Sequence, residues 1–171
     1  MILETKIVEK AAFSVIGQAE TIHFDPSLPP SENTISQLWK EFNGRCCEIE
    51  GQVGFRAYGL VLHKPGSNPN DPFAYTAAVQ VSGEASPPTG MIRLEVPAAR
   101  YAVVTLRGPL DEISQGFQYF WGQWLPASPY EYDGGTLTGK YEFEFYDQRC
   151  TTPDDPNSEI DLYFPVRGKV E

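Results

Sequence analysis

The order strand, helix, strand, strand occurs twice in the pattern of this 171-residue sequence, and this duplication restricts the folds that the chain can adopt. Strands are predicted where apolar and polar residues alternate, and helices where apolar residues recur every three or four positions. The predicted elements are residues 7–16, extended with a bend at residues 10–12, then 31–43, 55–62 and 73–81 in the first half, and 91–96, 100–106, 109–125, 141–147 and 159–166 in the second. Short fragments also agree, because Ile35-Ser36-Gln37 and Ile113-Ser114-Gln115 both fall in the predicted helices.

The duplicated order predicts an α+β fold in one domain over residues 1–171, with two split units at about 1–82 and 91–167. The sheet of either unit alone is too small to bury its helix well. The two units are therefore expected to join into one antiparallel sheet with two helices across it. A pseudo-two-fold axis between them would place a ligand cleft at the junction.

Each predicted helix carries an apolar stripe with aromatic residues. Trp39 lies on the stripe of the first helix, and Phe117 and Trp121 lie on the wider stripe of the second. Core packing and lining of the cleft are both open for these three side chains.

The segment Tyr141–Asp147 alternates aromatic and acidic residues and is predicted to be a strand. Glu142, Glu144 and Tyr146 share one face of it. Glu144 is either solvated or buried beside a partner, because burying an unpaired carboxylate costs several kcal/mol, roughly. Alternation alone favours the solvated alternative for Glu144, and Glu142 is expected to be solvated.

The formal net charge of -10 argues against nucleic-acid binding, which needs clustered Lys and Arg. It also argues against binding to anionic membranes and favours cationic ligands through long-range attraction. The three cysteines do not form a disulfide framework, and the two histidines show no metal-ligand spacing, so neither a metal nor another cofactor is predicted. No apolar run has the length of a membrane span and the N-terminus is not a signal peptide, so a cytoplasmic location is expected.

Several segments, taken together and in order, resemble the GyrI-like family, also known as AraC effector-binding small-molecule-binding domains. The resemblance covers nearly the whole chain. Two positions depart from the family pattern, because Ala78 stands where the family usually has Gly, and Asp161 stands where it usually has Glu. The segments that carry the resemblance are Tyr58-Gly59, Phe73–Val79, Tyr101-Ala102-Val103, Trp124–Glu131, Phe143–Asp147 and Asp161–Val166.

The resemblance implies that Glu144 is the acidic group of a pocket that binds lipophilic, cationic aromatic molecules. Aromatic rings attract a cation by roughly 0.5–2 kcal/mol for each good contact. Tyr146 shares the face of Glu144, and Tyr163 and Asp161 would face the same way if the last two strands pair in register. The expected ligand-binding residues are thus Glu144, Tyr75, Trp121, Tyr58, Tyr163, Tyr146, Asp161, Phe117 and Trp39.

Two other functions stay open at this stage. Some family members resemble hydrolases of reactive small molecules, and in such an enzyme Glu144 would be the catalytic base. Others resemble gyrase inhibitors that act through a protein partner. No helix-turn-helix segment is recognised, so a stand-alone binding domain for multidrug or effector binding, in transcription regulation or sequestration, is expected. The ligand, a homodimer through an edge strand, and closure of the cleft by residues 65–72 are left undecided.

Overall fold

The computed structural model describes residues 1–23, 27, 34–66 and 71–170. The predicted start of the first helix near Ser31 and the centre of the 65–72 loop lie outside the described residues. The strands are β1 Ile2–Lys10, β2 Phe13–Ile22, β3 Gln52–Val61, β4 Phe73–Val81, β5 Ile92–Val96, β6 Ala99–Arg107, β7 Tyr130–Tyr132, β8 Glu142–Tyr146 and β9 Glu159–Gly168. The helices are α1 Thr34–Asn43, α2 Ser114–Tyr119 and α3 Leu125–Ala127, and the shorter helical turns are η2 Cys46–Glu48, η3 Leu110–Glu112 and η4 Phe120–Trp124.

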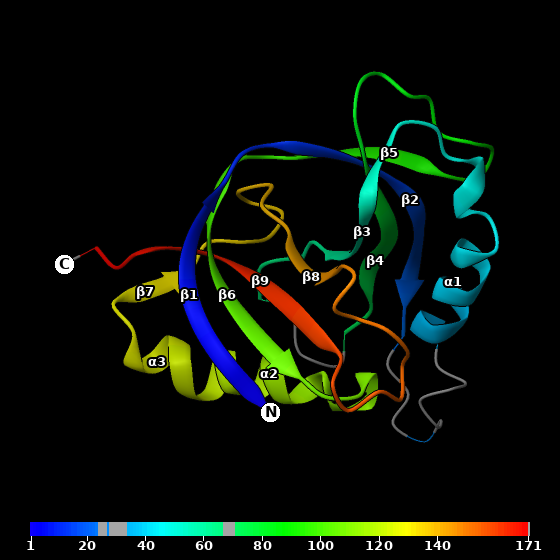
Figure 1. The fold of residues 1–171 in the computed structure, drawn as a ribbon. Coiled ribbons are helices and arrows are strands. Elements are labelled where there is room, and N and C mark those ends of the chain that lie inside the picture. Colours follow the sequence, from blue (N-terminus) through cyan, green and yellow to red (C-terminus); the bar gives the residue numbers. More distant parts are fainter. Residues whose placement is uncertain (24–26, 28–33, 67–70, 171) are drawn as a thin grey trace.

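The strands form one curved antiparallel sheet, which confirms the predicted α+β fold (Figure 1). Within the described residues the strand order is β1-β6-β9-β8-β3-β4-β2-β5, and β7 pairs with β9. Four strands lie on each side of the β3/β8 junction. The series β4-β2-β5 on one side therefore corresponds to β9-β6-β1 on the other.

The outermost strand on each side comes from the opposite half of the chain. β1 precedes β2 but pairs with β6, while β5 precedes β6 but pairs with β2. The bend predicted at residues 10–12 is confirmed, because the extended segment breaks at Ala11 and Ala12, where the chain crosses between the two sides. This exchange of edge strands ties the halves together, since separating them would break both pairings.

Both helical segments pack on the same face of the sheet. α1 lies against β2 and β4, where Leu38 and Phe42 are buried, and α2 lies against β6 and β9 (Figure 1). Gly116 allows the close approach of α2, because a Cβ atom there would lie 2.5 Å from Leu162. The opposite face of the sheet has its own aromatic core around Tyr58 and Tyr101.

The second helical segment is not the uninterrupted helix predicted over residues 109–125. It runs from Leu110 to Ala127 through η3, α2, η4 and α3, and Phe120–Trp124 is a π-helical turn. Pro126 lies in the last turn and has no N–H, so it cannot continue the hydrogen-bond ladder in which the Leu125 N–H donates to the Phe120 carbonyl oxygen. No helix in the described ranges is long and apolar enough to span a membrane.

Candidate functional site

A cleft of about 940 Å³ lies between α1 and the start of the second helical segment, above the central strands of the sheet. One wall carries Ile35 and Trp39 from α1, and the other carries Leu110 and Ile113. The floor includes Glu144 and Tyr146 from β8 and Ala57 from β3. The cleft is therefore largely apolar and aromatic, with one carboxylate at its base.

The Glu144 carboxylate is held by a chain of hydrogen bonds from aromatic side chains. Trp39 Nε1 donates to the Tyr75 hydroxyl at 2.7 Å, and that hydroxyl donates to Glu144 Oε2 at 3.0 Å. The Tyr146 hydroxyl donates to the same carboxylate oxygen. Trp39 and Tyr146 also meet edge to face, with ring centroids 5.5 Å apart. These four predicted residues thus come together in one site.

Burial raises the pKa of Glu144, and the hydrogen bonds from Tyr146 and Tyr75 offset part of this rise. The nearby Glu142 charge raises the Glu144 pKa further. Burial also raises the pKa of Tyr75 and of Tyr146 well above the usual range, so both hydroxyls stay protonated as donors. Glu144 keeps some solvent-accessible surface towards the cleft, but it lies deep enough for desolvation to dominate its titration.

Tyr163 and Asp161 lie on the opposite face of the sheet from Glu144, which makes their predicted orientation wrong. In the β8/β9 pair, Tyr163 is opposite Phe143 and Asp161 is opposite Phe145, whereas Glu144 is opposite Leu162. Directly paired residues share a face. Asp161 instead accepts hydrogen bonds from Thr105 Oγ1 at 2.7 Å and from Arg149 Nη2 at 2.7 Å.

Tyr58 is likewise placed away from the cleft. It pairs with Phe145 on the opposite face, is fully buried, and donates its hydroxyl hydrogen bond to Gln80 at 2.8 Å. Tyr58 and Tyr163 both belong to the aromatic core of that face. Their side chains stabilise the fold there and do not line the cleft above Glu144.

Phe117 and Trp121 are on the cleft side of the sheet but do not line the cleft. Phe117 packs edge to face on Phe164 at 5.6 Å. Trp121 is 42% exposed and contacts Tyr132 with ring centroids 4.7 Å apart. For both residues the structure therefore favours packing over the predicted pocket lining.

Glu142 is buried, at 5% exposure, so the prediction that it is solvated is wrong. Its Oε2 atom lies 3.0 Å from His63 Nε2, and this hydrogen bond raises the pKa of His63. His63 follows β3 and is 79 residues away in the sequence, so alternation along β8 cannot reveal the pairing.

Sequence reasoning also missed several polar residues of the cleft. Lys40, Asp111 and Asp154 line it, and none of the three is among the expected ligand-binding residues. The sequence gives no signal for these three residues, because they come from α1, η3 and the segment between β8 and β9, which only the fold brings together.

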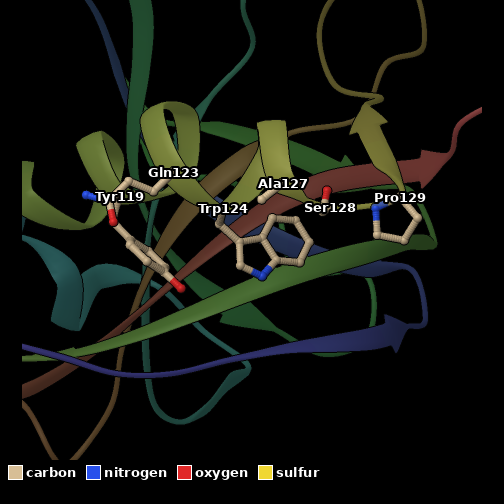
Figure 2. A pocket seen from close by; sticks show the side chains of 6 residues that line it. All are labelled: Tyr119, Gln123, Trp124, Ala127, Ser128 and Pro129. Atoms are coloured by element: carbon tan, nitrogen blue, oxygen red, sulfur yellow. The ribbon is translucent and has the colours of Figure 1, made fainter.

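A second, smaller hollow of about 410 Å³ lies on the second helical segment, away from Glu144 (Figure 2). Figure 2 shows the Trp124 and Tyr119 rings beneath the helix, with Gln123 beside them. This hollow is open and contains no charged side chain. We therefore regard the Glu144 cleft as the candidate site, because it combines larger volume with a buried carboxylate.

The described residues contain no group of three or more His, Cys, Asp or Glu side chains positioned to hold a metal ion. Cys46, Cys47 and Cys150 are free thiols.

The sequence of residues 3–167 matches the family described as the GyrI-like small molecule binding domain. The chain belongs to the GyrI-like family. A curated relative is the transcriptional regulator BrlR of Pseudomonas aeruginosa, which is 37% identical over 165 residues. The match covers 96% of this chain and 56% of BrlR, so this GyrI-like chain spans about half the length of that relative.

Solved structures share the GyrI-like fold at low sequence identity. The EcmrR C-terminal domain matches with a TM-score of 0.70 at 15% identity, covering 97% of this chain and 98% of that one. SAV2435 bound to tetraphenylphosphonium matches with a TM-score of 0.67 at 14% identity, covering 97% and 95% of the two chains. At these identities the matches establish the fold of the GyrI-like chain and leave its ligand to be argued from its own residues.

Proposed function

We propose that this GyrI-like domain binds lipophilic aromatic cations in the cleft between α1 and the second helical segment. The observation that carries the proposal is the Glu144 carboxylate at the floor of an aromatic cleft. Its hydrogen bonds come from two neutral tyrosine hydroxyls. None of the ion pairs in the described part of the chain includes it.

A lipophilic cation suits this environment for two physical reasons. Its charge is weakly hydrated, so the free-energy cost of removing it from water is small. Its charge also neutralises a carboxylate whose burial is costly. The faces of the Trp39 and Tyr146 rings attract a cation, by roughly 0.5–2 kcal/mol for each good contact. The cleft lining holds three carboxylates, Glu144, Asp111 and Asp154, and one ammonium group, Lys40, which further favours positive ligands.

The tetraphenylphosphonium complex of SAV2435 supports this choice of ligand class. We further propose that the domain acts as an effector sensor, since BrlR is a transcriptional regulator and contains a matching region. Apolar and aromatic walls accept many shapes, so we expect a broad range of ligands and not a single one.

The test is a titration with tetraphenylphosphonium, followed by calorimetry, on wild type, Glu144→Gln and Glu131→Gln. Glu131 is a carboxylate on β7 that pairs with Arg167 outside the cleft, so its variant controls for the change in net charge. We expect Glu144→Gln to lose tenfold or more in affinity, about 1.4 kcal/mol, and Glu131→Gln to bind like wild type. Equal binding by wild type and Glu144→Gln would refute the role of the carboxylate.

Recovery of the ligand separates binding from the hydrolase alternative. A reactive ester or epoxide analogue that is recovered intact after long incubation with the protein supports binding alone. Turnover that disappears in Glu144→Gln would instead support an enzyme in which Glu144 is the base.

A further inference from the structure

Phe55 in β3 is 87% exposed, although its ring is large and apolar. Single exposed hydrophobic residues are common on protein surfaces and need no explanation by themselves. Phe55 is different because of where the sheet places it, at the end of the strand that forms part of the cleft floor.

The backbone around Phe55 bulges out of the β3/β4 ladder. Gln52 pairs with Val81 and Ala57 with Val79, so five steps along β3 match two steps along β4. Gly54, with φ of 57°, supplies the left-handed conformation that starts this bulge. Bulges of this kind redirect side chains and are common beside functional sites.

Phe55 lies on the bulged part of β3, close in the chain to a residue of the cleft floor. Ala57, two residues further on, lines the cleft opposite Tyr146. Arg56, between them, acts electrostatically on Tyr58 and Asp147, and Tyr58 belongs to the opposite face. Two residues along a strand span roughly 6.6 Å. The Phe55 ring can therefore reach the open end of the cleft beyond Ala57.

The same end of the cleft is where α1 finishes. Asn43, its last residue, lines the cleft, and Gln52 at the start of β3 donates hydrogen bonds to the carbonyl oxygens of Cys46 and Ile49 just after the helix. The bulge and the end of α1 thus lie next to each other at one mouth of the cleft. Phe55 is the exposed aromatic residue of the bulge.

We propose that Phe55 is an aromatic flap that turns over this mouth and stacks on a bound lipophilic cation, so that the site prefers aryl-substituted cations to alkyl ones of equal charge. This inference rests on the proposed function and adds a residue that determines ligand selectivity. An exposed ring loses water on closing over a ligand, and its face attracts the positive charge.

The experiment compares tetraphenylphosphonium with tetrabutylphosphonium on wild type, Phe55→Ala, Phe55→Tyr and Leu137→Ala. Leu137 is 84% exposed and lies in the segment between β7 and β8, so its variant controls for loss of an exposed apolar side chain. We expect Phe55→Ala to weaken tetraphenylphosphonium binding on the order of threefold to tenfold, with a smaller loss for tetrabutylphosphonium. Phe55→Tyr should restore binding, and Leu137→Ala should leave it unchanged.

The outcomes distinguish the flap from the proposed function. If wild type and Phe55→Ala bind tetraphenylphosphonium equally, the flap is wrong and the ligand class stands. If wild type binds neither cation, the flap and the proposed function both fall. A change in sedimentation coefficient for Phe55→Ala with unchanged affinity would assign the ring to a contact between copies of the chain and would overturn the flap. Unchanged thermal stability of Phe55→Ala is expected, because the ring is exposed in the free protein.

Discussion

Gly59 in β3 and Glu144 in β8 are direct partners across the central strand pair, and the missing side chain of Gly59 is what leaves room for the carboxylate. A Cβ atom on Gly59 would lie 2.1 Å from the Tyr75 hydroxyl oxygen and 2.7 Å from Glu144 Oε2. Both distances are well inside van der Waals contact. The hydrogen bond between Tyr75 and Glu144 therefore depends on glycine at position 59.

Gly59→Ala is expected to displace Tyr75 or Glu144 and to weaken tetraphenylphosphonium binding by about tenfold, the equivalent of one lost hydrogen bond to a charged group. Gly122→Ala is the matched control, because nothing lies within 4 Å of a Cβ atom there. Calorimetric titration of both variants checks the prediction. Wild-type affinity in Gly59→Ala would show that the cleft tolerates the methyl group and that the Tyr75 contact is dispensable.

Tyr75→Phe is expected to weaken binding at pH 7 by about threefold to tenfold, because Glu144 loses one of its two donors. Trp39 Nε1 also loses its acceptor, which loosens the wall of the cleft. With one donor fewer, the pKa of Glu144 rises further, so the loss of affinity on acidification should begin at a higher pH than in wild type.

Tyr58→Phe is the control for Tyr75→Phe. Tyr58 is an equally buried tyrosine with a hydroxyl hydrogen bond, but it lies on the opposite face of the sheet. Both variants are compared by ligand titration at two pH values and by thermal unfolding. Equal effects of the two changes on affinity would mean that loss of stability, and not the cleft network, explains the result.

How far the sequence predicts this site is clear from β8. Alternation correctly groups Glu142, Glu144 and Tyr146 on one face, since it depends only on neighbouring residues. It cannot tell which carboxylate reaches the cleft, because that depends on Tyr75 and His63, which come from other strands and loops. The membership of Glu144 in the site was expected from the family resemblance and not from periodicity.

The error for Tyr163 and Asp161 has a specific cause. Their shared face within β9 was correct, but the pairing of β9 with β8 decides whether that face matches Glu144. A shift of one residue moves every side chain of a strand to the other face. The pattern within one strand does not give this register, which is seen only in the folded pair, where Arg149 of the connecting loop also forms an ion pair with Asp161.

Affinity for a lipophilic cation is expected to fall as the pH is lowered through the pKa of Glu144. Only the ionised carboxylate attracts the ligand, and burial raises this pKa above its ordinary value of 4.5. Below it, each pH unit costs up to about tenfold in affinity, because one proton must leave for each cation bound. Titrations of wild type from neutral to acidic pH test this, and Glu144→Gln should show a flat profile. A flat wild-type profile would place the counter-charge elsewhere.

His63 and Glu142 predict a different pH dependence, one of stability. The hydrogen bond to Glu142 raises the pKa of His63 in the folded state above its unfolded value of about 6.5. A group with a raised folded pKa stabilises the protein fully below its unfolded pKa, and this contribution is lost as the pH rises through the folded pKa.

His63→Gln should therefore lower the melting temperature more at pH 5.5 than at pH 8.5. The side chain of His63 is 36% exposed, so solvent screening limits the pH-dependent part to about 1 kcal/mol or less. His23→Gln is the matched control, since His23 is the other histidine of the chain and is exposed. Calorimetry of the three proteins at both pH values measures the effect. If the difference in melting temperature between wild type and His63→Gln is the same at both pH values, or larger at pH 8.5, then the protonated His63 ring does not stabilise the folded protein.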